Sequence, residues 1–159
     1  METKEALLDR LSKAVEELIA VCRQLPDPAA AIYEGWSAKD ILGHVTFWHE
    51  SFARNVADLV HDRKPTPLKG KLSDLNQQGV DEMRPCSLEE VIGRLKAAQR
   101  IIYRHILNPK LSLIPYRKGS RDYAPEEHLS VVADHIGAHL KAIQGKGQQK
   151  RSASRVRSK

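Results

Sequence analysis

The chain has 159 residues, of which 41% are hydrophobic and 29% charged, and these values are typical of a single globular domain. A chain of this length buries enough surface to fold without disulfides or structural metals. No apolar run approaches the roughly 20 residues of a membrane span, and the charged N-terminal sequence lacks a secretory signal segment. Cys22 and Cys86 form no CxxC motif. We therefore expect reduced thiols in a cytoplasmic protein that has no membrane partner.

The formal net charge of +6 comes from the C-terminal residues. Residues 145–159 contain six lysines and arginines and no acid, which leaves 20 basic and 20 acidic residues in 1–144. We predict a folded domain over 1–144 and a disordered basic tail over 145–159, because the tail is rich in Gln, Ser, Lys and Arg. An electroneutral domain and a tail without aromatic residues do not favour a nucleic-acid partner.

In the first half of the domain, apolar residues recur every three or four positions over two long stretches, as they do on one face of a helix. The first stretch begins after Thr3, a good capping residue, and ends near Leu25, before two prolines. The second begins with the capping box Ser37–Asp40 and extends to about His61. A shorter helix is predicted over Ser73–Met83.

The second half of the domain repeats this organisation. A second capping box, Ser87–Glu90, opens a helix that extends to about Leu107. Residues 111–124 are predicted to be an irregular loop, and Pro125 suits the first position of a last helix that ends near Gln144. No segment alternates in polarity as strands do. The sequence thus predicts an all-α fold, an antiparallel four-helix bundle.

Three of the seven histidines are spaced in a way that suggests a metal site. His135 and His139 lie four residues apart, which places both imidazoles on one helix face within reach of a single cation. His44 lies on the flank of the apolar stripe of the second long helix, and packing of the two helices would bring it to this pair. Three imidazoles could hold a divalent ion and leave positions open for water or substrate. From spacing alone, a solvated surface pair is the alternative.

Two motifs resemble those of the DinB-like (DinB/YfiT) superfamily. The segment Gly35–Trp48 is similar to the start of the second helix of that family, in which a WS-x-KD motif precedes a histidine and an aromatic residue follows four positions later. The pair in His135–His139 resembles the second metal-binding motif of the family. Asn76 and Ser87–Glu90 also resemble the subgroup that contains the colibactin self-resistance hydrolase. The resemblance extends over about residues 33–143.

The resemblance implies a four-helix bundle in which His44, His135 and His139 hold a divalent metal ion, with zinc, nickel, manganese and iron all left open. Characterised relatives include low-molecular-weight-thiol S-transferases, mycothiol-dependent isomerases and a cyclopropane hydrolase. The resemblance therefore implies a small-molecule substrate, with a low-molecular-weight thiol as a further partner, but it does not identify the reaction. Homodimerisation through helix faces is compatible with such a bundle.

Two further residues are candidates for catalysis. Asp40 precedes His44 by one helical turn and could orient its ring through a hydrogen bond, or it could serve only in the capping box. His128 precedes His135 by seven residues and therefore shares its face. It could carry protons, since histidine titrates near neutral pH, or it could be a half-exposed residue near a helix start.

One position departs from the family pattern, because many relatives carry a glutamate directly after the helix aromatic and this chain has His49 there. His49 falls on the flank opposite His44 and is not predicted to be a ligand. Four residues of the loop before the last helix either form a solvated surface or line a pocket mouth that binds an anionic group: Tyr116, Arg117, Arg121 and Tyr123.

Three functions are compatible with these features. The first is a metal-dependent enzyme that acts as a hydrolase or thiol S-transferase on a small, toxic molecule. The second is a non-catalytic protein that binds and sequesters such a molecule in the same pocket. The third is an interaction module that uses the basic tail. The sequence favours the first.

Overall fold

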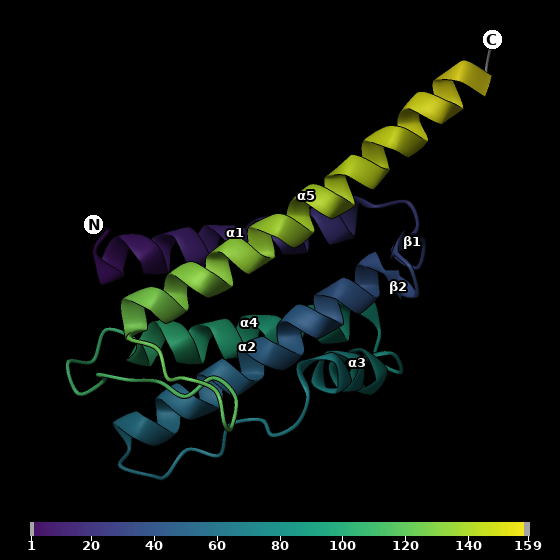
Figure 1. The fold of residues 1–159 in the computed structure, drawn as a ribbon. Coiled ribbons are helices and arrows are strands. Elements are labelled where there is room, and N and C mark those ends of the chain that lie inside the picture. Colours follow the sequence, from purple (N-terminus) through teal and green to yellow (C-terminus); the bar gives the residue numbers. More distant parts are fainter. Residues whose placement is uncertain (1, 158–159) are drawn as a thin grey trace.

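The computed structural model describes the backbone of residues 2–157 and the side chains of residues 2–146. Over this range, four long helices form a bundle with shorter elements at its edge (Figure 1). The long helices are α1 (Lys4–Gln24), α2 (Ala38–Val60), α4 (Leu88–His105) and α5 (Pro125–Arg157). The shorter elements are β1 (Ala31–Tyr33), β2 (Trp36–Ser37) and α3 (Leu72–Met83). The predicted all-α four-helix bundle is confirmed.

All four long helices begin where the sequence predicts, and Pro125 is the first residue of α5. The Thr3 side chain accepts a backbone hydrogen bond at the start of α1. Ser37 and Asp40 complete a capping box at the start of α2, and Ser87 and Glu90 complete one at the start of α4. Each capping box satisfies two backbone N–H groups that a helix start otherwise leaves unpaired.

The long helices pack in two pairs, α1 with α5 and α2 with α4 (Figure 1). Arg10 near the start of α1 donates a hydrogen bond to Asp134 near the start of α5, at 2.8 Å. His61 and His105, at the ends of α2 and α4, have ring centroids 5.3 Å apart. The helices of each pair therefore run in the same direction, and the two pairs are antiparallel to each other. Long crossover connections make this order feasible.

The core lies between the helix pairs, and its large side chains exclude solvent. The largest side chains that are fully buried come from all four long helices, among them Leu11, Leu18, Ile41, Leu42, Ile92, Leu95, Ile102, Leu129 and Ile136. Because α2 packs against α1, α3, α4 and α5, it is buried on nearly every side over its first three turns. Polar residues on the flanks of its apolar stripe are therefore buried as well, which matters for the site.

Where the sequence predicts a loop before the second long helix, the structure forms a small antiparallel hairpin. Tyr33 pairs with Trp36, and the two residues between them close the turn. Gly35 adopts a φ of 80°, a conformation that glycine adopts without the strain of a side chain. These strands are too short to show an alternating pattern in the sequence. The hairpin places Tyr33 beside His139 of α5, with ring centroids 5.8 Å apart.

The helix α5 continues to Arg157, beyond the end predicted near Gln144, and it projects past the other helices (Figure 1). The predicted disordered tail, 145–159, falls almost wholly on residues whose side chains lie outside the described ones, so it remains a prediction. In the part of the chain that the structure describes, no helix is long and apolar enough to cross a membrane.

The predicted short helix is present as α3, and two glycines allow it to approach α2 closely. A Cβ atom on Gly79 would lie 2.6 Å from Cγ of Phe47, and one on Gly43 would lie 2.8 Å from Cβ of Met83. Both distances are below any normal contact, so the backbones of α2 and α3 approach to a distance that only glycine permits.

We expect Gly79→Ala to lower the free energy of unfolding by about 1–3 kcal/mol, because the added methyl overpacks the α2–α3 contact. Gly93→Ala is the matched control, since no atom lies within 4 Å of a Cβ built at this position in α4. There the substitution should stabilise the helix by about 0.5–1 kcal/mol. Urea unfolding of both variants measures the difference. Equal effects of the two substitutions would contradict the close packing.

Candidate metal centre

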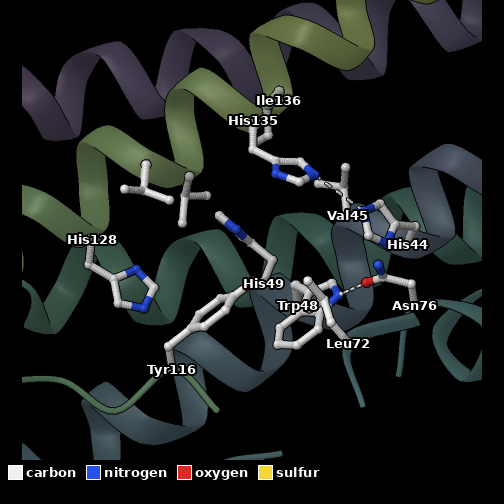
Figure 2. A pocket seen from close by; sticks show the side chains of 12 residues that line it. His44, Val45, Trp48, His49, Leu72, Asn76, Tyr116, His128, His135 and Ile136 are labelled. Carbon is white, nitrogen blue, oxygen red and sulfur yellow. Dashed lines mark hydrogen bonds between the residues drawn. The ribbon is translucent and has the colours of Figure 1, made fainter. Parts of the chain in front are cut away.

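The three predicted ligands lie together where α2 faces α5. His44 is in the second turn of α2, and His135 and His139 lie one turn apart on α5. One ring nitrogen from each lies within 4.8 Å of the other two. Nε2 of His44 is 3.4 Å from Nε2 of His135, and a dashed line joins the two rings in Figure 2. Tertiary packing thus brings His44 to a pair of histidines that begins 91 residues later in the sequence.

The environment keeps these imidazoles neutral. Burial, together with the neighbouring His139 and His135, lowers the pKa of His44 to about 3. Burial, with a contribution from His135, lowers the pKa of His139 to about 4. Burial also lowers the pKa of His135, although its side chain is the most exposed of the three. Neutral imidazole is the form that binds metal, so these residues need not lose a proton at pH 7 to become ligands.

The hydrogen bonding of His139 fits a metal ligand. Its Nε2 is buried and has no hydrogen-bond partner, while its Nδ1 lies 3.0 Å from the hydroxyl of Tyr33. A buried ring nitrogen without a partner costs free energy that a bound cation would recover. If Nε2 binds a metal, Nδ1 carries the proton and donates it to the Tyr33 oxygen, which fixes the tautomer and the ring orientation. The residues present therefore fit a divalent ion held by three imidazoles.

We expect Tyr33→Phe to weaken zinc binding by about 10-fold or more, because His139 loses the hydrogen bond that orients it. Competition with a chelating dye measures the affinity. Tyr103→Phe is the control, because Tyr103 is 62% exposed on α4. An affinity unchanged in both variants would show that Tyr33 does not position His139.

A pocket extends from His44 and His135 along the α2–α5 interface (Figure 2). Its cavity has a volume of about 90 Å³, and an adjoining cavity of about 110 Å³ shares Tyr116, His128 and Val131 with it. Trp48 stacks on Tyr116 with ring centroids 4.9 Å apart, and its indole N–H donates to Asn76 at 2.8 Å. The candidate metal ligands thus lie at one end of an apolar, aromatic pocket, which is the usual setting of a small-molecule site.

A family profile, described as the mycothiol maleylpyruvate isomerase N-terminal domain, matches residues 11–102. The matched residues make up more than half of the sequence and include His44. The chain belongs to this family. The family is part of the DinB/YfiT-like superfamily, as the sequence resemblance implies. The profile ends before His135 and His139, so these two ligands rest on the geometry of this chain. Among curated proteins, none matches the sequence.

Solved structures share the fold of this family member. An uncharacterised protein from Clostridium difficile 630 matches with a TM-score of 0.75 and 19% identity, over 93% of this chain and 97% of the other. An uncharacterised protein from Escherichia coli UTI89 gives 0.73 and 14%, over 95% and 96%. The mycothiol-dependent maleylpyruvate isomerase gives 0.71 and 10%, over 89% of this chain and 61% of its own. At these identities the comparisons establish the fold alone.

His49, where many relatives carry glutamate, is a pocket residue that the sequence analysis missed. It is 1% exposed and lines the pocket, and its Nε2 lies 2.6 Å from Oε1 of Gln99 on α4. Burial lowers its pKa to about 4 although the Gln99 bond raises it. The sequence contains a signal for the burial of His49, because His49 follows Val45 by four residues and precedes Phe52 by three, and both of these are core residues.

His128 is buried rather than half-exposed, which makes that alternative of the sequence analysis wrong. It is 3% exposed, stacks on Phe52 with centroids 3.9 Å apart, and has an Nδ1 atom without a hydrogen-bond partner. Burial lowers its pKa to about 4. Figure 2 shows its ring at the opposite end of the pocket from His44, on the side of Tyr116. His128 therefore faces the pocket and not the three-histidine cluster.

The structure does not bring Asp40 to the ring of His44. The Asp40 carboxylate accepts from the Ser37 backbone N–H at 3.0 Å and from Arg84 at 3.2 Å. These partners lower its pKa even though burial, the largest single influence, acts in the opposite direction. Nδ1 of His44, the nitrogen that Asp40 would have to contact, is buried without a partner. The contacts of Asp40 are those of the capping alternative.

The loop before α5 supplies aromatic residues to the pocket but no cation. Tyr116 and Tyr123 line it, whereas Arg117 donates to the carbonyl of Gly70 at 2.9 Å. Arg121 pairs with Glu127 at 3.0 Å and lies over the Tyr123 ring at 4.0 Å. Among the described pocket residues, no guanidinium is therefore free to bind an anionic group at the pocket mouth, as one alternative of the sequence analysis requires.

Proposed function

We propose that this chain is a metal-dependent enzyme, in which His44, His135 and His139 hold a divalent ion and activate water or a low-molecular-weight thiol against a small molecule. The observation that carries this proposal is the cluster of three neutral imidazoles at one end of the pocket. Structures of the same fold include a protein described as a mycothiol-dependent isomerase, which supports the thiol as one of the two nucleophiles.

A divalent ion with three neutral ligands keeps its positive charge and an open position, and it lowers the pKa of a bound water or thiol toward neutrality. The chain's own residues would do the rest. Tyr33 orients His139, and Trp48 and Tyr116 hold the apolar part of the substrate. His128 is neutral at pH 7, and its unpartnered Nδ1 can form a hydrogen bond with the substrate at the far end of the pocket. Zinc, nickel and iron suit imidazole donors, while manganese prefers oxygen ligands.

The test is the metal content of full-length protein purified without an affinity tag or chelator, followed by a spectroscopic titration. We expect close to one divalent ion per chain. After replacement of the ion by cobalt(II), mycothiol or cysteine should add a thiolate-to-metal absorption band if a thiol is the nucleophile. A hydrolase should show no such band but should cleave activated esters or amides only when metal is present.

Failure to bind zinc, nickel, manganese or iron would rule out the metalloenzyme. Metal binding without turnover, together with tight retention of a small molecule, would instead favour the sequestering protein, which uses the same pocket. The apolar lining of the pocket supports this second candidate. A cytoplasmic location, the homodimer and the interaction role of the basic tail remain proposals that this experiment does not address.

A further inference from the structure

The pocket beside the three histidines contains no charged side chain. Its lining, among the residues that the structure describes, consists of aliphatic and aromatic groups, one asparagine and four histidines, with no Asp, Glu, Lys or Arg. The two histidines outside the metal cluster, His49 and His128, have pKa values lowered to about 4 by burial and are neutral at pH 7. A charged ligand group would therefore lose its hydration in this pocket without gaining an ionic partner.

The two arginines of the loop before α5 do not supply the missing ionic partner. Arg121 is paired with Glu127 and stacked on Tyr123, and Arg117 is bonded to a backbone carbonyl. Neither lines the pocket. A pocket for a carboxylate or phosphate substrate would be expected to present at least one guanidinium or ammonium group.

Two consecutive hydrogen bonds fix which ring nitrogen of His49 carries the proton. The amide nitrogen of Gln99 donates to the hydroxyl of Ser12 at 3.0 Å, so the amide oxygen faces His49 and accepts from its Nε2–H at 2.6 Å. A neutral histidine with its proton on Nε2 has a lone pair on Nδ1. Among the side-chain hydrogen bonds of the described residues, His49 takes part through Nε2 alone, and its side chain lines the pocket. Figure 2 shows the His49 ring reaching into the pocket between His135 and Tyr116.

We propose that the pocket selects an uncharged molecule with an apolar body and a hydroxyl or amide N–H group that donates to Nδ1 of His49. The proposal rests on the proposed function, because it names the substrate class of the same site. In this proposal the apolar body contacts Trp48 and Tyr116, and the donor group bonds the ring nitrogen of His49 that does not take part in the Gln99 bond. In the metal-free protein an anionic substrate is selected against, since the described pocket residues supply no counter-charge.

Benzyl alcohol and three close analogues test this selectivity by ligand-observed NMR, with quenching of Trp48 fluorescence as a second signal. We expect benzyl alcohol to bind more than about 10-fold more tightly than benzoate or benzylammonium, which must lose the hydration of a charge. It should bind about 5-fold more tightly than benzyl methyl ether, which has the same body but no donor. Each measurement uses the full-length protein, once with chelator and once with zinc.

Gln99→Glu provides the sharper variant. A carboxylate in place of the amide still accepts from Nε2 of His49 but favours the protonated ring, so Nδ1 becomes a donor. We expect the ratio of benzyl alcohol to benzoate affinity to fall by about 10-fold or more. His49→Leu should abolish the preference for benzyl alcohol over its ether if the variant folds. His105→Gln, outside the pocket, should change neither ratio.

The outcomes separate this proposal from the proposed function. A preference for benzyl alcohol in the presence of chelator supports the uncharged substrate class even if no metal binds. Benzoate or benzylammonium binding as tightly as benzyl alcohol in chelator-treated protein would overturn it even if the metal site is real. If Gln99→Glu leaves the ratio of benzyl alcohol to benzoate affinity unchanged, His49 does not bind the donor group of the ligand.

Discussion

His139→Ala should weaken zinc binding by more than about 100-fold, because it removes one of three ligands and leaves only two imidazoles to hold the ion. His44→Ala should have the same effect, since the ligands come from two helices and neither helix supplies three donors. The effect is larger than that of Tyr33→Phe, which removes only the orienting hydrogen bond. Titration against a competing chelator measures the affinity of each variant.

His105→Ala is the matched control, because His105 forms the second histidine pair of the described chain, with His61 at the ends of α2 and α4. This pair has no third histidine, cysteine or carboxylate grouped with it. We expect zinc affinity in this variant to equal that of the wild type. If His105→Ala weakens zinc binding as much as His139→Ala does, the three-histidine cluster is not the principal site.

Acidification from pH 7 to pH 5 should lower the free energy of unfolding of the metal-free protein by several kcal/mol. Burial lowers the pKa of both His49 and His128 to about 4, whereas an unfolded histidine titrates near 6.5. Between these values the unfolded chain binds more protons than the folded chain, so stability is full above pH 6.5 and falls as the pH approaches 4. Each of the two groups contributes a loss of about 2 kcal/mol at pH 5.

Urea unfolding in chelator at pH 7 and pH 5 measures this loss. His44 and His139 act in the same direction, since their pKa values are also lowered. His128→Phe should reduce the difference between the two pH values, because it removes one buried titrating group. A stability that does not depend on pH in this range would mean that these histidines are protonated or exposed in the folded protein.

Local sequence signals predicted most of the helical framework. Hydroxyl and carboxylate residues three positions apart mark the starts of α2 and α4, and the spacing of apolar residues marks their buried faces. The same reasoning placed His135 and His139 on one face, because their spacing is a property of a single helix. These features depend on neighbours within four residues, so they can be derived from the chain alone.

For α2, the position of the apolar stripe was a misleading guide to which side chains are buried. The stripe assigns a histidine to the core or to a flank, but α2 is surrounded by other helices, so its flanks are buried too. This is why His49 was passed over and why His44 is almost fully buried. For His128, proximity to the helix start suggested exposure, whereas Phe52 and the tyrosines of the preceding loop cover it.

The helices, their capping residues and the pair of histidines on one helix follow from local sequence patterns. The meeting of His44 with this pair, the contact of Tyr33 with His139 and the uncharged lining of the pocket follow from the packing of the helices. The physical reason is the range of the interactions. Helix periodicity and capping act over one turn. The ligand cluster and the Gln99–His49 bond instead join residues that are 91 and 50 positions apart in the sequence, and these contacts are set by packing alone.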